Sequence, residues 1–244
     1  MKDFGYAISD GSRFNKARKI VACLEYVDDL KGKNILEIGC GSGIIAYEIS
    51  KKANAVTALD VIENTFVDAM KNIVPSEMSL SFVKGNGENL PFHDCCFDTV
   101  ICNQVFEHVK NQKELISEIL RVLKVSGLCY IATGNKLWPL EPHAKLPFLS
   151  MMPGPIADRY IKMFRGISEY TVNLPTYWKW EHILSRAFSK RIDLSITVIR
   201  NPNEFYLSDE APKLILSILR RLPLFILKLL LPFFKSWITI CIKR

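Results

Sequence analysis

The sequence predicts an α/β protein built on a doubly wound, mostly parallel sheet of seven strands. Five apolar stretches of strand length alternate with helical patterns between residues 34 and 133. Such alternation requires right-handed crossovers between parallel strands. Two more strand patterns follow, at 191–199 and 237–242, and an apolar, basic insertion at 208–235 precedes the last one.

The composition fits one globular domain, which we expect to span residues 1–244. The chain has 244 residues, of which 49% are hydrophobic and 23% charged, enough to bury a large core. Its seven cysteines contain no C-x-x-C pair, so we expect reduced thiols in a cytoplasmic protein and neither disulfides nor a zinc site. The first residues, M-K-D-F-G-Y, lack the apolar stretch of a signal peptide.

The net charge of +7 is concentrated in the last quarter of the chain. Residues 181–244 hold 11 Lys or Arg and 5 Asp or Glu, whereas residues 1–180 hold 21 and 20. Because this basic quarter is also very apolar, we expect it to contact an anionic membrane surface and not nucleic acid.

A helical pattern at 14–30 leads into the stretch I-L-E-I-G-C-G-S-G-I-I-A, residues 35–46. This order of strand, glycine turn and helix makes a nucleotide-sized binding corner, with the first helical amides pointing at the ligand. A dinucleotide fingerprint would need a third glycine at position 44, which is Ile44. The Glu37 carboxylate would repel a pyrophosphate but suits a cation such as S-adenosylmethionine. The alternatives are a tight turn without a ligand and a nicotinamide oxidoreductase.

The string E-I-G-C-G-S-G at 37–43 resembles motif I of the class I S-adenosylmethionine-dependent methyltransferases. The resemblance covers roughly residues 30–190 and implies the Rossmann-like methyltransferase fold. It also implies that the string holds the methionine end of the donor, through Glu37, Gly39, Cys40, Gly41 and Gly43.

The second strand pattern, at 55–59, ends in Asp60, 21 residues beyond Gly39. An acidic residue there is placed to accept hydrogen bonds from both ribose hydroxyls, with Val61 beside the nucleoside. Alternatively, Asp60 caps a helix that begins at about Glu63.

The third strand pattern, at 80–83, leads to G-N-G-E-N-L-P-F at 85–92. This resembles the G-D-A-E-x-L-P-F segment of the small-molecule branch of the family. The resemblance implies that Asn86, standing in place of the acid, accepts a hydrogen bond from the adenine amine through its carbonyl. Gly87 stands in place of the alanine.

The fourth strand pattern, at 97–102, is followed by N-Q-V-F-E-H, at the edge where open α/β sheets bind ligands. The resemblance places Asn103 and Gln104 where the methyl group faces the acceptor. Glu107 and His108 match an E-H pair of this branch. In polyprenyl-quinone O-methyltransferases an E-x-x-E-H string serves a metal, but Gln104 replaces its first member, so we expect no metal. Alternatively, Glu107 and His108 form an interior pair that pins the loop.

A helix at 112–124, a turn at 122–127 and a strand at 128–133 lead into a proline-rich loop at 133–153. The loop resembles the segment T-P-N-R-x-x-P-x-E-P-H-x-x-L-P-F-L of bacterial methyltransferases in cell-envelope glycan and lipid pathways. It implies an acceptor pocket with Glu141 and His143; the alternative for His143 is a loop hydrogen bond. Because histidine titrates near neutral pH, His143 and His108 are the candidate catalytic bases.

We therefore expect a donor-binding core at 30–135 and an acceptor loop and lid at 136–190. The lid includes 159–170 and a helix at 177–188. At 208–235 we expect two short basic helices in the membrane interface, because Pro223 and Pro232 interrupt any spanning helix. A dimer interface or a lid over a greasy substrate are the alternatives for this segment.

The predicted function is methyl transfer from S-adenosylmethionine to an oxygen of a membrane-associated acceptor, a lipid-linked glycan or an isoprenoid quinone. The protein would lie in the cytoplasm at the inner face of the membrane. Two other classes stay open. One is the nicotinamide oxidoreductase, which Ile44 and Glu37 disfavour. The other is a non-catalytic, membrane-associated binding module, for which Asn86 is the only indication.

Overall fold

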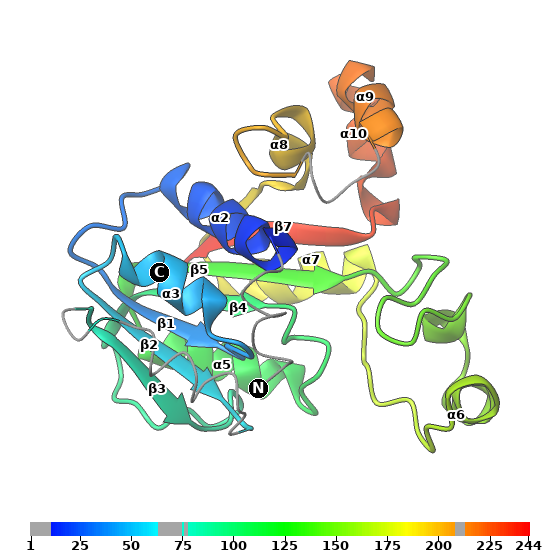
Figure 1. Cartoon of the computed structure of the whole chain (residues 1–244), viewed down its shortest axis with the longest axis horizontal. Coiled ribbons are helices and arrows are strands. Elements are labelled where there is room, and N and C mark those ends of the chain that lie inside the picture. Colours follow the sequence, from blue (N-terminus) through cyan, green and yellow to red (C-terminus); the bar gives the residue numbers. More distant parts are fainter. Residues whose placement is uncertain (1–10, 63–74, 76–77, 208–212) are drawn as a thin grey trace.

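Seven strands form one sheet in the order β3-β2-β1-β4-β5-β7-β6, in a computed structural model that describes residues 11–62, 75, 78–207 and 213–244. Strands β1 to β5 run parallel, and β7 pairs antiparallel with both β5 and β6. The strands are β1 Asn34–Ile38, β2 Ala55–Asp60, β3 Leu80–Lys84, β4 Phe97–Asn103, β5 Leu123–Gly134, β6 Lys190–Asp193 and β7 Ser236–Ile242. The predicted sheet is confirmed (Figure 1).

Helices cover both faces of the sheet because successive strand residues point to opposite sides. Ile35 joins a core beneath α2 (Gly11–Glu25), α3 (Ile44–Ser50) and α8 (Ser195–Arg200). Leu36 joins the opposite core, beneath α5 (Gln112–Val122) and α7 (Tyr177–Ala187). In the second core, the Trp180 ring meets Phe106 edge-on at 5.2 Å between centroids. The layers are those of a doubly wound fold.

The strand order reverses between β1 and β4, and this reversal positions the candidate site. Strand β1 lies between β2 and β4, with Ile38 opposite Cys102. The glycine turn after β1 and the loop after β4 therefore emerge side by side. In open α/β sheets, such a switch point forms a crevice for ligands.

The predicted strand at 191–199 is wrong in its second half, where the chain forms α8. The Asp193 carboxylate accepts a hydrogen bond from the Ser195 backbone N–H at 2.8 Å, just before the helix begins. Leu194 and Val198 are both buried. They are four residues apart, a spacing that fits one face of a helix as well as alternate positions of a strand.

Two other predicted bounds shift. The first helix ends at Glu25 and not near Leu30, although Leu30 stays fully buried in the core. Strand β5 starts at Leu123, inside the predicted turn, and its pairing with β4 changes register between Phe97 and Thr99. Ser126, at φ 61°, makes this irregularity. The segment expected at about Glu63 lies outside the described residues.

Two helical segments project from the side towards which the arrow of β5 points (Figure 1). One holds η1 (Leu149–Met151) and α6 (Gly154–Arg165), which starts five residues before the predicted lid. The other holds α9 (Lys213–Arg221), α10 (Leu224–Leu230) and η2 (Leu231–Phe233). Over the described part of the chain, none of the helices has the length and apolar character needed to cross a bilayer.

Candidate active site

The glycine turn after β1 is held against the end of β2. The backbone N–H groups of Gly39 and Cys40 both donate to the Leu59 carbonyl, at 2.7 and 3.0 Å. Gly39, Gly41 and Gly43 have φ of 72°, 51° and 74°, which favours glycine at each. A Cβ on Gly39 would lie 2.3 Å from Val105 Cγ2, whereas nothing lies within 4 Å of one on Gly41. The turn therefore leaves an approachable backbone at Gly41.

Glu37 lies beneath this turn and is only 1% exposed. Its carboxylate accepts a hydrogen bond from the backbone of Ala46, a first-turn amide of α3 that lacks a helical partner. Burial, together with the charge of Asp60, raises the Glu37 pKa well above its usual range. Its Oε2 atom has no partner among the described residues. Glu37 thus supports the turn and keeps one free acceptor.

Asp60 ends β2 and also holds the glycine turn. Its Oδ2 accepts the backbone N–H of Gly41 at 2.8 Å, and its Oδ1 accepts that of Ile62 at 3.1 Å. Because each carboxylate oxygen has two lone pairs, capacity remains for ribose hydroxyls. Val61 beside it is 55% exposed and offers an apolar surface.

Asn86 and Gly87 lie in the loop after β3. Asn86 is exposed, and its Oδ1 accepts the Glu88 backbone N–H at 3.0 Å. Gly87 is buried, and a Cβ there would lie 3.0 Å from Ile38 and 3.1 Å from Leu115. The glycine therefore allows the loop to approach the end of β1. The adenine contact of Asn86 stays a prediction.

Asn103 and Gln104 stand at the switch point itself. Asn103 is the last residue of β4, and the Gln104 backbone N–H donates to the Ala132 carbonyl at 2.9 Å. Gln104 has a positive φ of 56°, which turns the chain sharply. This turn places Val105 over Gly39 and Phe106 in the core.

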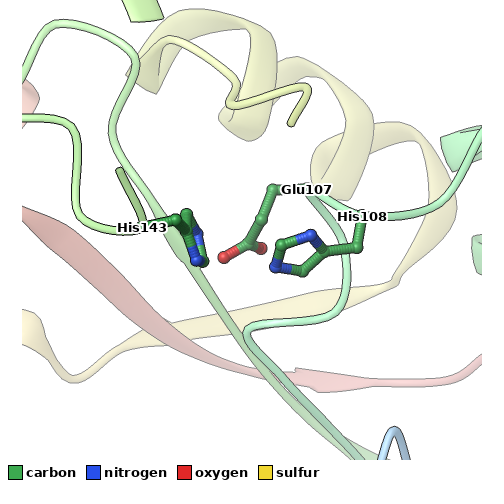
Figure 2. A group of neighbouring side chains, drawn as sticks. All are labelled: Glu107, His108 and His143. Atoms are coloured by element: carbon green, nitrogen blue, oxygen red, sulfur yellow. The ribbon is translucent and has the colours of Figure 1, made fainter. Parts of the chain in front are cut away.

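Glu107, His108 and His143 come together from two loops (Figure 2). The Glu107 carboxylate points towards both imidazole rings, whose centroids lie 4.7 Å apart. Glu107 is fully buried; its Oε2 accepts the Thr133 hydroxyl at 2.9 Å, and its Oε1 has no described partner. One potential ligand atom from each residue lies within 4.8 Å of the others. The structure thus joins both predicted bases, in a geometry that could also hold a metal ion.

Burial shifts the pKa values of Glu107 and His108 in this cluster. Burial raises the pKa of Glu107, and the hydrogen bond from Thr133 opposes the rise. Burial lowers the pKa of His108, and the negative charge of Glu141 opposes the fall. His108 is therefore largely neutral at neutral pH and can accept a proton.

Glu141, a candidate for the acceptor pocket, has a fully buried side chain. Its Oε2 accepts the backbone N–H groups of His143, at 2.8 Å, and of Ala144. The Tyr170 hydroxyl donates to Oε1 at 3.4 Å. Glu141 shapes the E-P-H turn and so positions His143.

Three residues that the sequence does not single out hold Glu107 and its loop in place: Thr133, Gln112 and Asn173. Gln112 Nε2 donates to the carbonyls of Phe106, at 3.1 Å, and Asn173, at 2.9 Å. The Asn173 backbone N–H donates to the Glu107 carbonyl at 2.7 Å. These bonds hold the E-H loop against the segment before α7. The sequence marks Gln112 only as the start of a helical pattern and does not show that this side chain is buried.

Comparisons with known proteins point to methyltransferases. Residues 36–131 match a family described as a methyltransferase domain. A ubiquinone biosynthesis O-methyltransferase of Rickettsia bellii is 30% identical over 111 residues, 46% of each chain. The Rickettsia typhi protein of that name is 29% identical over 111 residues, 46% of this chain and 45% of its own. The match thus spans about half the length of these curated relatives.

Solved structures share the fold. An S-adenosylmethionine-dependent methyltransferase from Mesorhizobium loti has a TM-score of 0.61 and 13% identity, covering 94% of this chain and all of its own. The [4+2]-cyclase SpnF has a TM-score of 0.55 and 18% identity, covering 94% of this chain and 80% of its own. Residues 36–131 thus resemble a methyltransferase domain, and the predicted resemblance to the class I S-adenosylmethionine-dependent methyltransferases is confirmed.

Proposed function

We propose that this protein transfers a methyl group from S-adenosylmethionine to an oxygen of a membrane-associated acceptor. The observation that carries the proposal is the cluster of Glu107, His108 and His143 at the sheet edge that bears the glycine turn. Fold alone does not decide the activity, because the cyclase SpnF shares it. The proposal therefore rests on the groups at this edge.

The donor side fits S-adenosylmethionine in three ways. The backbone at Gly41 is approachable. Glu37 Oε2 is a buried acceptor without a described partner, suited to an ammonium group. Asp60 retains lone pairs for ribose hydroxyls. When bound, the donor supplies an electrophilic methyl group on a sulfonium that becomes neutral on transfer, so alignment of donor and acceptor is the main task of the protein.

On the acceptor side, His108 takes the proton of an acceptor hydroxyl, either directly or through the adjacent His143. The buried Glu107 carboxylate faces both rings, and when ionised it stabilises the imidazolium that forms. Two imidazoles and one carboxylate oxygen also suit a transition metal ion. Full turnover after treatment with EDTA would favour the base; loss of turnover that a divalent ion restores would favour the metal.

The membrane-associated acceptor is supported by two observations. The similar Rickettsia proteins are named for ubiquinone biosynthesis. The segment before β7 exposes large apolar side chains, including Leu214, Phe225 and Leu229. A lipid-linked glycan and an isoprenoid quinone are the acceptor classes that we propose, with peripheral membrane contact through 208–235.

Turnover of radiolabelled donor in membrane extract, with recovery of the methylated product, tests the function. His108→Ala or His143→Ala should lower turnover by about 10²–10⁴-fold, because each variant removes a candidate base, and should leave donor affinity nearly unchanged. His182→Ala, an exposed histidine on α7, is the matched control. Wild-type turnover in both variants would exclude these bases. Binding of NADH without binding of S-adenosylmethionine would support the oxidoreductase alternative instead.

A further inference from the structure

We propose that α6 forms a second lipid-binding surface, so that the protein docks on an anionic bilayer by two patches that flank the acceptor edge. The inference rests on the proposed function in one respect: the edge that carries the E-H and E-P-H loops is taken as the side where the acceptor enters. Its new elements are the role of α6 and the orientation, in which the E-H and E-P-H loops face the membrane.

The first patch, the α6 patch, consists of Ile156, Met163, Phe164 and Ile167. They are 57%, 68%, 56% and 48% exposed, respectively. Ile156 and Met163 are seven residues apart and so lie on one face of the helix. The helix is fastened by Ala157 and Ile161, which pack on Leu146 and Leu149 in a separate small core. The four exposed side chains are thus not needed for that core.

The α6 patch has basic neighbours. Arg159, Lys162 and Arg165 are exposed on the same helix. The single acid of α6, Asp158, accepts the Tyr170 backbone N–H at 2.8 Å. An apolar edge beside several cations is the pattern of a helix lying in a membrane interface.

The second patch, the C-terminal patch, consists of Leu214 and Ile218 on α9 and Phe225 and Leu229 on α10. They are 74%, 54%, 64% and 70% exposed. Each pair is four residues apart, on the side away from the buried Leu216 or Leu227. The same segment exposes four cations: Arg220, Arg221, Lys228 and Lys235. The sequence from 213 to 244 contains no acidic residue.

Asn135 links both patches to the acceptor edge. It follows the end of β5 and is 1% exposed. Its Nδ2 donates to the carbonyls of Pro232 and Phe234, at 3.0 and 2.8 Å, which ties η2 to the start of the acceptor loop. The same loop carries His143 and continues into α6. In Figure 1 the two projections extend from this side of the sheet.

The charge favours lipid over a second copy of the chain. Two copies meeting through either patch would bring like charges together, which opposes association. An anionic bilayer attracts these cations and accepts the apolar side chains at the same time. An acceptor held in the bilayer would then enter between the two patches.

Co-sedimentation with phosphatidylcholine vesicles, with and without phosphatidylglycerol, tests the docking. Wild-type protein should bind the anionic vesicles more strongly. Two double variants should each weaken binding by about tenfold or more: Ile156→Asn with Met163→Asn, and Phe225→Asn with Leu229→Asn. The expected loss follows because apolar side chains that insert into the bilayer contribute to the affinity. Val125→Asn is the control, because Val125 is 71% exposed at the opposite end of β5. Calorimetry with S-adenosylmethionine should give the same donor affinity in every variant.

The orientation has its own test. Tryptophan placed as Met163→Trp or Leu229→Trp should be quenched by brominated lipids in anionic vesicles, and Val125→Trp should not. Quenching at Leu229→Trp but not at Met163→Trp would overturn the role of α6. Equal binding to neutral and anionic vesicles would overturn the anionic-bilayer assignment. A wild-type protein that dimerises and stays in the supernatant would overturn lipid binding altogether. None of these readouts requires methyl transfer, so they can fail while the proposed function stands.

Discussion

Replacing Asp60 by alanine tests the donor site most directly. The substitution removes the acceptors of the Gly41 and Ile62 backbone N–H groups and any acceptor for ribose hydroxyls. A hydrogen bond to a charged group contributes about 1.5–3 kcal/mol, but Asp60 is only half-buried, so water partly replaces the lost bonds. We expect a loss of about 1–3 kcal/mol in donor binding, which is a 5- to 150-fold rise in Kd.

Isothermal calorimetry with S-adenosylmethionine measures this loss, and denaturant unfolding checks that the variant folds. Asp29→Ala is the matched control, because the Asp29 carboxylate also accepts an N–H two residues on, from Lys31, far from the site. Asp60→Asn should rescue only in part, since its amide must turn an NH₂ group towards one of the two N–H groups. A folded Asp60→Ala variant with wild-type donor affinity would refute the role of Asp60.

Three further outcomes follow from the same site. Gly39→Ala and Gly41→Ala both place a side chain at positive φ, but only the Gly39→Ala side chain would meet Val105. Gly39→Ala should therefore lower the free energy of unfolding by about 1–3 kcal/mol more than Gly41→Ala in thermal unfolding. Equal losses would contradict the contact with Val105. Glu37 has a raised pKa in the folded state, so its contribution to stability is present below the unfolded pKa and lost as pH rises through the folded pKa. Glu37→Gln should remove that loss, and its stability relative to wild type should grow with pH across this window; a constant difference would exclude the shift. If His108 is the base, turnover should fall on acidification through a pKa below the 6.5 of a free histidine, and an acidic limb unchanged in His108→Asn would point to another group.

The donor core was predictable because its signals are local. The glycine turn and the apolar strands around it are contiguous in sequence; strand, turn and helix follow one another as predicted, and β2 matches the predicted strand at 55–59 to within one residue. The predicted secondary structure is wrong where one pattern of apolar residues fits both the period of a strand and that of a helix. Leu194 and Val198 fit both an alternating strand and a helical face, and the chain forms a helix there, with the Asp193 carboxylate accepting the Ser195 backbone N–H at its start. Leu30 is buried although its helix has already ended, so burial extended the predicted helix too far.

The roles of the acidic residues at the site could not be predicted from the sequence alone. Glu37 and Glu141 are both buried and accept backbone N–H groups of the segments that follow them, and Glu37 keeps one oxygen, Oε2, without a described partner. A carboxylate before a turn can face a ligand or hold the turn, and only the three-dimensional contacts distinguish these roles. The contact between His108 and His143, with ring centroids 4.7 Å apart, could not be predicted from local sequence, because the two residues are 35 positions apart. Their shared edge follows from the topology, but their contact depends on the turn that Glu141 shapes. Glu141 thus shapes the loop that carries His143, and the two exposed histidines remain the groups that we propose for the acceptor side.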